Sequence, residues 1–305
     1  MENIPHKPVL LREVLEAFST EKSGVFIDAT LGYGGHSSAI LENSPNLHLI
    51  GIDKDITAVE FSKKRLKKFG NRVKILHGTF SEKIEEAKTL FPDLLILGVL
   101  ADIGVSSLQL DNTDRGFSFN SPNLDMRMDQ NSNLTGNEVV NRYSEFRLHE
   151  IFRDFGELKN SKKLARVIVN NRPIESGLEL ASLIEQNSGR KSGGIHPATL
   201  VFQAIRIEVN RELEELETLL NSLKTLENSQ VGIISFHSLE DRIVKDTFRD
   251  WSKSCICPPE AIQCTCGDNH QLGKPLSKKP IVAKNDEVSE NPRSRSAKLR
   301  IFNLL

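Results

Sequence analysis

The chain lacks the features of a membrane or disulfide-bonded protein. No apolar run in it approaches the roughly 20 residues that a bilayer-spanning helix needs. Its first residues show no apolar segment of the kind found in signal peptides. Only four cysteines are present. We therefore expect a cytoplasmic protein whose cysteines stay reduced.

The chain also lacks an excess of charge of either sign. Forty Lys and Arg residues face 41 Asp and Glu residues, so the formal net charge is −1. No global positive field marks it as a nucleic-acid binder, and local clusters must carry any such function. Internal repeats and low-complexity tracts are absent as well. Its 305 residues suffice for one large domain or two modest ones, each with its own core.

Strand-like apolar runs recur regularly in the first hundred residues. They end at Asp28, Asp53, Gly78 and Asp102, at spacings of 25, 25 and 24 residues, with helical patterns between them. This alternation predicts repeated βα units and a parallel sheet. The run 94–100 is almost entirely apolar, as expected of a central strand buried on both faces.

The alternation stops after Asp102. The next strand candidate, 231–236, comes about 130 residues later, and mostly helical patterns fill the interval. So long a gap predicts an inserted helical domain. The helical patterns cover 138–155, 159–171, 178–186 and 197–226. The expected division is 1–110 for the first part of the α/β domain, 111–212 for the helical insertion and 213–305 for the second part.

The most informative stretch follows the first strand. Residues 28–36 read Asp-Ala-Thr-Leu-Gly-Tyr-Gly-Gly-His, which predicts a strand, a glycine-rich turn and a helix start. Asp53 lies 21 residues after Gly32, at the end of the next strand, where it could accept hydrogen bonds from ribose hydroxyls. The pattern predicts a nucleoside cofactor on a doubly wound sheet, and a purely structural glycine turn is the alternative.

The loop does not by itself identify the cofactor. Ser37 stands where the dinucleotide fingerprint has its third small residue. A pyrophosphate would favour the full fingerprint, whereas S-adenosylmethionine has no such anion to bind. The spacing to Asp53 suits both NAD and S-adenosylmethionine.

Polar side chains follow the fourth and fifth strands. Asp102 ends the fourth strand at the edge where open α/β sheets bind ligands, although an aspartate there can also simply cap a helix. Residues 235–242 place Ser, His, Glu, Asp and Arg at the tip of the fifth strand, where His237 or Ser238 could cap the next helix. No Gly-x-Ser-x-Gly elbow is present, so we do not predict a hydrolase.

Two segments carry arginines suited to RNA. Arg115, followed by Gly-Phe-Ser-Phe, could bind a phosphate beside a stacked base. A packed turn is the alternative, and we favour it for Phe119. Arg293 and Arg295 lie in the rigid, hydroxyl-rich segment 291–296. A solvated charged face is the alternative for both arginines.

The four cysteines lie close together in the sequence. Two Cys-x-Cys pairs are separated by six residues, a compact thiol set that suits tetrahedral zinc. Structural zinc sites more often use Cys-x2-Cys, so a reduced surface loop or redox-labile thiols are the alternatives. The candidate ligands are Cys255, Cys257, Cys264 and Cys266.

Together these motifs resemble the bacterial ribosomal RNA small subunit methyltransferase H family, also called the MraW family. The resemblance implies a Rossmann-like class I methyltransferase fold with an inserted all-helical domain that recognises the substrate. It also implies S-adenosylmethionine-dependent methylation of the exocyclic N4 of a cytidine in the decoding region of 16S rRNA, within the small ribosomal subunit. The resemblance runs nearly end to end, through residues 6–11, 34–36, 102–107, 115–119, 124–129, 196–199, 235–242 and 291–296.

Matched motif by motif, the resemblance implies seven cofactor contacts. It does not identify the catalytic residue, which we infer only from its position in the sequence. Asp102 is our candidate acceptor for the substrate amine, although its motif is not the Asn/Asp-Pro-Pro-Tyr/Phe of many amino-methyltransferases. Leu108 replaces a proline common in relatives. Some relatives lack the four-cysteine loop, so catalysis should not need a metal. The implied contacts are Gly34, Gly35, His36, Asp53, Phe80, Asp102 and Gln109.

Other functions remain open at this point. A methyltransferase acting on another RNA, a protein or a small molecule would share the cofactor loop, but it would not need the arginine-rich segment or the large insertion. A zinc-stabilised RNA-binding module would bind metal and no cofactor. An NAD oxidoreductase is less favoured than either, because the third loop glycine and any evident hydride-transfer residues are missing.

Overall fold

The computed structural model describes residues 8–188 and 197–305, so His6, Lys7 and His196 of the motifs above lie outside the described part. The chain forms two compact units. The first combines Met1–Gly104 with Glu214–Leu305, and the second is Val105–Leu213. Within the described residues, no helix is long and apolar enough to cross a membrane.

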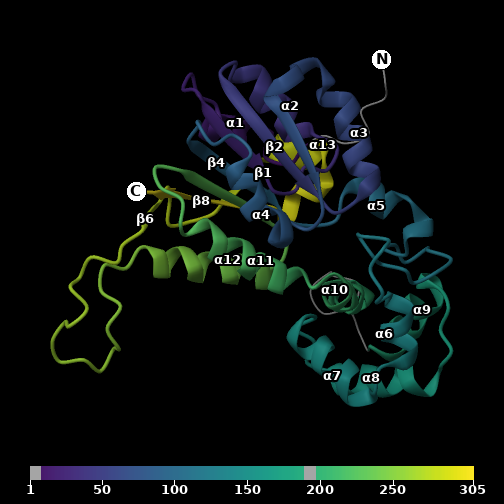
Figure 1. Ribbon diagram of the computed structural model, residues 1–305. Helices are drawn as coiled ribbons and strands as arrows, with labels where there is room; N and C mark the ends of the chain where they lie inside the picture. The colour runs from purple at the N-terminus through teal and green to yellow at the C-terminus, as the bar shows by residue number, and fades with distance from the viewer. Residues whose placement is uncertain (1–7, 189–196) are drawn as a thin grey trace. The chain divides into compact units, whose positions relative to one another are not determined.

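The first unit contains one eight-stranded sheet in the order β3-β2-β1-β4-β5-β8-β6, with β7 paired to β8 (Figure 1). Its first five strands are parallel, and β6, β7 and β8 pair antiparallel. The strands are β1 Gly24–Asp28, β2 Leu47–Asp53, β3 Val73–His77, β4 Ile96–Asp102, β5 Gln230–Ser235, β6 Gly273–Pro275, β7 Ile281–Val282 and β8 Lys298–Leu304.

In the sheet, β2 pairs with one side of β1, and β4 pairs with the other side. The carboxyl ends of β1 and β4 therefore meet at the point where the strand order reverses, the place where open α/β sheets bind ligands. Register aligns Asp28 with Leu100, and Asp102 with Ile234 of β5. The loops after β1, β2, β4 and β5 thus share one edge.

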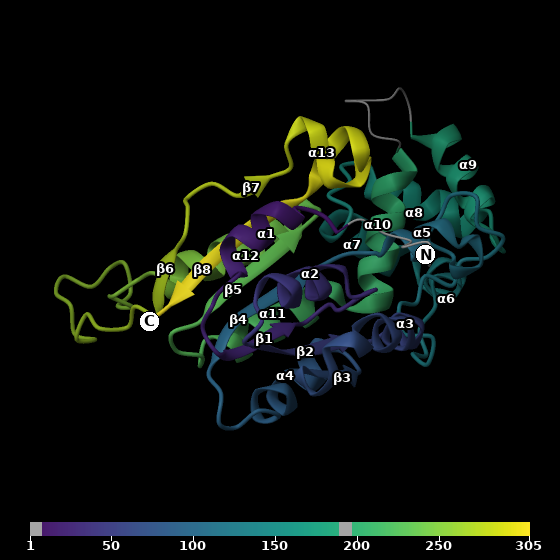
Figure 2. The ribbon, with the colours of Figure 1, turned by 90° about the horizontal axis from the view of Figure 1, so that it is seen from above.

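Alternate strand residues face opposite helical layers. Val25 and Ile27 pack into the core formed with α4, α11 (Glu212–Leu223) and α12, whereas Phe26 packs with α1, α2 and α3. The view from above shows α1 and α2 lying over the strands (Figure 2). The helices of this unit are α1 Leu11–Phe18, α2 Gly35–Asn43, α3 Ile56–Leu66, η1 Lys67–Arg72, α4 Phe80–Thr89, α12 Ser238–Trp251, α13 Asn285–Glu290 and η3 Pro292–Ser296.

The second unit has helices and no strand in its described residues. Its separate core includes Phe117, Phe152 and Phe202. Phe119 packs edge-on against Phe202, with ring centroids 4.8 Å apart, which agrees with the packed-turn interpretation. Its helices are α5 Ser107–Asp111, η2 Thr113–Arg115, α6 Gly136–Arg142, α7 Glu145–Asp154, α8 Ser161–Asn170, α9 Gly177–Asn187 and α10 Pro197–Asn210, and α11 Glu212–Leu223 crosses into the first unit.

Two long predicted helices are each broken in the structure. The predicted helix 138–155 divides where Tyr143 turns extended (φ −65°, ψ 145°) and Ser144 caps α7. The predicted helix 197–226 divides at Arg211, whose φ is 50°. In both cases the apolar periodicity continues across the break, so it does not mark the break. The short β6, β7 and α13 carry too little pattern for prediction.

Candidate functional site

The glycine-rich loop after β1 has the strand–turn–helix form that the sequence predicts. Gly34 has φ 69° and precedes α2, a left-handed conformation that favours glycine. At Gly35 an added Cβ would lie 2.5 Å from Pro8 Cγ, so a side chain there would displace the preceding segment. Above Gly32, by contrast, the nearest atom to an added Cβ is 3.8 Å away. An added Cβ at Gly32 would therefore make an ordinary van der Waals contact, although its φ of 51° is one that side chains rarely adopt.

Asp53, at the end of β2, holds this loop in place. Its Oδ2 accepts a hydrogen bond from Gly32 N at 2.6 Å, and its Oδ1 accepts one from Asp55 N at 2.8 Å. Burial raises the pKa of Asp53, and these two hydrogen bonds oppose the shift. Each carboxylate oxygen has a second lone pair, so the group can still accept a ribose hydroxyl.

Two carboxyl groups lie at the carboxyl ends of β1 and β4. Asp28 is 2% exposed and accepts hydrogen bonds from Ser37 Oγ at 2.6 Å and from Thr30 N at 3.3 Å. Burial raises the pKa of Asp28 to about 6, although these bonds oppose it. Thr30 Oγ1 in turn accepts from Asp102 N at 2.6 Å, which joins the two strand ends.

Among these carboxyl groups, Asp102 has the pKa that is raised furthest. Burial, reinforced by the negative charges of Asp28 and Glu240, raises the pKa of Asp102 to about 7. Its Oδ1 is buried without a hydrogen-bond partner. An unpartnered buried carboxylate oxygen is costly, and a donor supplied by a ligand would satisfy it.

His36, at the start of α2, lies beside Asp102. Its Nε2 is 2.8 Å from Val9 O, and since a carbonyl can only accept, Nε2 carries a proton. Its Nδ1 lies 3.9 Å from Asp102 Oδ2. Because that distance exceeds a hydrogen bond, the contact is electrostatic, and a proton on either group favours it.

Glu240 adds a third buried carboxyl near this edge. Its Oε2 accepts hydrogen bonds from Phe236 N at 2.8 Å and His237 N at 3.3 Å, which caps α12. His237 Nε2 lies 3.0 Å from Glu240 Oε1. His237 Nδ1 accepts a hydrogen bond from Glu240 N at 3.4 Å, so His237 caps α12, which is one of the two caps that the sequence offers.

Phe80 begins α4, directly after β3. Its side chain is 9% exposed and packs into the core with Ile84 and Ala87. β3 is paired with β2 so that His77 lies opposite Asp53. Phe80 therefore follows the strand next to Asp53, and the cofactor contact that the resemblance implies for it stays a prediction.

Gln109 and Arg115 belong to the second unit. Gln109 is 7% exposed, and its Oε1 accepts a hydrogen bond from Ser106 N at 3.0 Å. Arg115 is 9% exposed, and its guanidinium donates to the carbonyl oxygens of Arg127 and Met128, both at 3.0 Å. These bonds hold a turn together and favour the packed-turn interpretation over phosphate binding. RNA contact through Arg115 stays a prediction.

Arg293 and Arg295 lie in η3, and both are exposed. The next strand begins at Lys298, which is opposite Ser235 at the end of β5. β5 is in turn paired with β4, with Ile234 opposite Asp102. Register thus places the arginine segment at the same edge of the sheet as Asp102.

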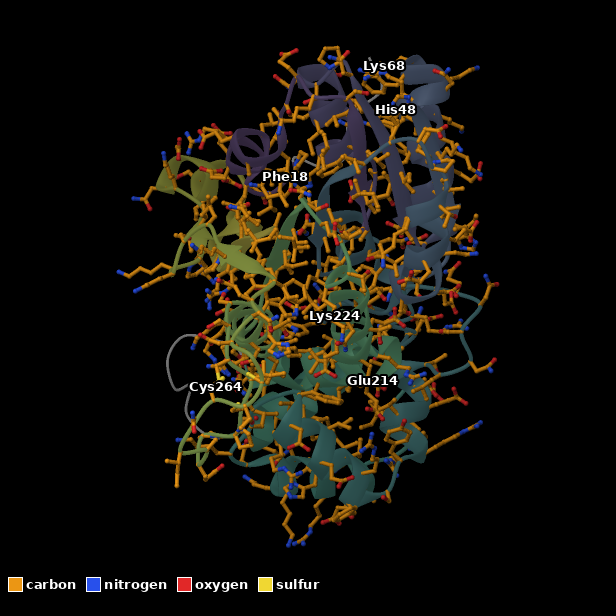
Figure 3. All side chains as sticks on the ribbon, turned by 60° about the vertical axis from the view of Figure 1, so that its left-hand side comes forward. Phe18, His48, Lys68, Glu214, Lys224 and Cys264 are labelled. Carbon is orange, nitrogen blue, oxygen red and sulfur yellow. The ribbon has the colours of Figure 1, made fainter. Side chains whose placement is uncertain are left out.

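The first unit also has a cavity of about 420 Å³ near the amino ends of the parallel strands. Phe18, labelled in Figure 3, lines it together with Gly98 and Gln230. Most of its other lining residues come from loops that precede strands or from strand starts. It is not at the edge that carries the carboxylates.

The arrangement fits a nucleoside cofactor that carries positive charge. Asp53 can accept ribose hydroxyls, and the carboxyls of Asp28, Asp102 and Glu240 at one sheet edge attract a cation when they are ionised. Asp28, Thr30, Ser37 and Glu240 were not assigned to the site from the sequence. Asp28 and Glu240 carried a signal, since Asp28 is the last residue of β1 and Glu240 lies five residues after the end of β5.

The comparisons with known proteins agree with this geometry. The profile of the MraW methylase family matches residues 3–305. The chain is 57% identical over 302 residues to the ribosomal RNA small subunit methyltransferase H of Nitratiruptor sp., covering 98% of each chain. It is 56% identical over 308 residues to the protein of that name from Campylobacter curvus, again covering 98% of each.

Among solved structures, the chain is similar to an rRNA methylase from Streptococcus thermophilus. The TM-score is 0.38 and the identity 10%, over 96% of this chain and 93% of that chain. Similarity of this degree says nothing about activity.

Proposed function

The chain belongs to the MraW methylase family, a family of S-adenosylmethionine-dependent methyltransferases, and from this premise we propose that it methylates the N4 amine of one cytidine in the decoding region of 16S rRNA. Two observations support the proposal. Curated relatives that align over nearly the full chain are named as small-subunit rRNA methyltransferases. The carboxylate of Asp102 has a buried oxygen with no partner at the ligand-binding edge of the sheet.

When bound, S-adenosylmethionine supplies a methyl group on a positively charged sulfur, from which an amine can displace it in line. The cytosine amine is a weak nucleophile because its lone pair is delocalised into the ring. Asp102 Oδ1 would accept a hydrogen bond from this amine and so turn the lone pair toward the methyl group. This role requires the ionised carboxylate. The carbon–nitrogen bond would form as the carbon–sulfur bond breaks, and the methylated amine would then give its extra proton to solvent.

The chain's other residues would position the reactants. We assign Gly34, Gly35 and His36 to the cofactor loop, Asp53 to the ribose and Phe80 to the adenine. Gln109 is assigned on the family resemblance alone.

The helical second unit and the exposed arginine segment would bind RNA in the small ribosomal subunit, which places the protein in the cytoplasm. A cytidine within a helix must also leave its stack to reach a buried carboxylate.

The direct test uses small ribosomal subunits that lack the modification. We would incubate them with the protein and labelled S-adenosylmethionine and map the methyl group by nucleoside mass spectrometry. The expected product is N4-methylcytidine at a single site. Methyl on another base or on another RNA would overturn the substrate assignment. Cofactor binding without transfer to any ribosomal particle would overturn the activity on this substrate.

A charge-reversal experiment tests the RNA contact. We expect Arg293→Glu/Arg295→Glu to weaken RNA binding at least tenfold and to reduce the salt dependence of binding by about two charges. The matched control is Lys64→Glu/Lys67→Glu, which reverses two exposed charges on and directly after α3. Equal binding by wild type and the arginine variant, or equal losses in both variants, would contradict this assignment.

A further inference from the structure

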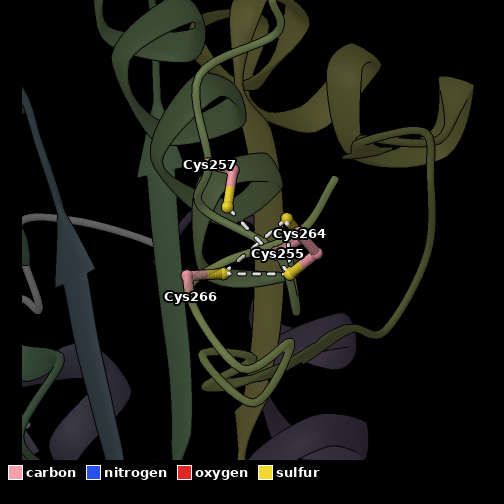
Figure 4. Close-up of side chains that lie close together, drawn as sticks. All are labelled: Cys255, Cys257, Cys264 and Cys266. Atoms are coloured by element: carbon pink, nitrogen blue, oxygen red, sulfur yellow. Dashed lines mark hydrogen bonds between the residues drawn. The ribbon is translucent and has the colours of Figure 1, made fainter. Parts of the chain in front are cut away.

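The geometry points to a structural zinc site formed by Cys255, Cys257, Cys264 and Cys266, in the loop between α12 and β6. This loop extends away from the sheet (Figure 1), and Figure 4 shows the four side chains turned toward one another. The sulfur atoms all lie within 4.8 Å of one another. The inference does not depend on the proposed methyl transfer.

The sulfur spacing matches a tetrahedron. Zinc–thiolate bonds of about 2.3 Å in tetrahedral geometry place neighbouring sulfurs about 3.8 Å apart. Cys264 Sγ lies 3.6 Å from Cys255 Sγ, 3.6 Å from Cys266 Sγ and 4.0 Å from Cys257 Sγ. Cys266 Sγ lies 3.7 Å from Cys255 Sγ. Four separations close to the tetrahedral value leave room for one metal ion among the sulfurs.

Two equivalent backbone hydrogen bonds are donated to sulfur atoms of the cluster. The middle residue of each Cys-x-Cys pair donates its N–H to the last cysteine of the other pair. Ile256 N donates to Cys266 Sγ at 3.4 Å, and Thr265 N donates to Cys257 Sγ at 3.3 Å. Such bonds favour the thiolate over the thiol, and the thiolate is the form that binds metal. They also give the tight Cys-x-Cys spacing a role, because the intervening residue supplies the donor.

The loop has no apolar core that could hold its tip. Its two large apolar side chains, Ile256 and Ile262, are 59% and 105% exposed. Its base is closed by hydrogen bonds, from Leu272 N to Trp251 O at 2.8 Å and from His270 N to Ser254 O at 2.9 Å. The half-buried and exposed cysteines are therefore the side chains that converge in the described loop tip, and a metal bound among them would supply the free energy of ordering it.

Zinc accounts for the cluster better than disulfides or iron. The shortest of these four separations, 3.6 Å, far exceeds a sulfur–sulfur bond of about 2.05 Å, and all four thiols are free. Tetrahedral four-sulfur sites take zinc or iron, and zinc binds more tightly than divalent iron to the same ligands. Binding involves no redox change: four zinc–sulfur bonds form and the thiols lose their protons to solvent.

The test measures metal content directly. The full-length protein is purified under reducing conditions without chelator, and its metals are quantified by inductively coupled plasma mass spectrometry. We expect about one zinc per chain in the wild type. We expect at least about a tenfold lower content in Cys257→Ser/Cys264→Ser, because two of the four ligands are lost. The matched control, Ile262→Ser, changes a fully exposed residue of the same loop and should keep its zinc.

A second measurement uses the wild-type chain alone, so a folding defect in a variant cannot decide the result. Endoproteinase cleavage after Glu260, in the exposed tip, should accelerate when a strong chelator removes the metal and slow again when zinc is restored. Wild-type protein without zinc that takes none up under reducing conditions would overturn the inference. So would iron in place of zinc, two disulfides in the freshly purified protein, or unchanged zinc in the double cysteine variant.

Discussion

The raised pKa of Asp102 makes the proposed reaction depend on pH near neutrality. With a pKa of about 7 in the free protein, the carboxylate gains its charge as the pH rises through that value. The ionised fraction increases from about one-tenth at pH 6 to about nine-tenths at pH 8, roughly a tenfold change. If the ionised group both attracts the cationic cofactor and accepts the amine, kcat/KM for S-adenosylmethionine should rise about tenfold over this range. Positively charged S-adenosylmethionine favours the ionised form of Asp102 once it is bound. The rise of kcat with pH should therefore occur at lower pH than the rise of kcat/KM.

The assay compares wild type, Asp102→Asn and Asp93→Asn at saturating small subunits from pH 6 to pH 8. Asp102→Asn should lose the pH step and reduce kcat by about 10² to 10³, as loss of one well-placed transition-state contact does. Asp93→Asn removes an exposed carboxylate in the loop before β4 and should keep the wild-type profile. The reasoning is refuted if Asp102→Asn retains the same step, or if the wild-type rate falls as the pH rises.

Three further predictions follow from the same residues. The folded-state pKa of Asp102 lies above its ordinary value of 3.8, so this carboxyl destabilises the fold as the pH rises from about 4 to 7. In urea denaturation, Asp102→Asn should therefore stabilise the protein by about 2 kcal/mol more at pH 8 than at pH 5. Equal effects of the substitution at both pH values would contradict this. Gly35→Ala should weaken cofactor binding at least tenfold by calorimetry, because its methyl would lie 2.5 Å from Pro8 Cγ. Gly70→Ala meets nothing within 4 Å but lies at φ 58° and ψ −130°, so it should cost about 1–3 kcal/mol of stability and leave binding intact. Phe80→Leu keeps an apolar side chain in the core but removes the ring, and should raise the cofactor Kd about tenfold; an unchanged Kd would remove Phe80 from the adenine site.

The zinc site and the proposed methyl transfer would use different parts of the chain. Its ligands all lie in the loop between α12 and β6, whereas the proposed reaction uses the edge of the sheet formed by the ends of β1, β2 and β4. Loss of zinc should therefore make the loop between α12 and β6 less ordered and leave Asp102 and the glycine-rich cofactor loop in place.

The sequence by itself determines the alternation of the first four strands with helices. Each strand lies in a short apolar run, and the runs end at nearly equal intervals, at Asp28, Asp53, Gly78 and Asp102. These features depend on residues close together in the chain, so local periodicity is enough to predict them. The glycine-rich loop belongs to the same class, since its turn and helix start are set by neighbouring residues.

Tertiary structure decides which distant groups meet. Glu240 raises the pKa of Asp102 although 138 positions separate them, and no local pattern reports that pairing. Arg115 resembles a phosphate-binding arginine in the sequence, but in the fold its guanidinium is bonded to the carbonyls of Arg127 and Met128. The cysteine spacing shows that four thiols are near one another, whereas only the folded loop places Cys264 within 3.6–4.0 Å of the other three sulfurs. Burial and long-range contact set the charge, the partners and the ligands of a side chain, and these depend on the whole fold rather than on the neighbouring sequence.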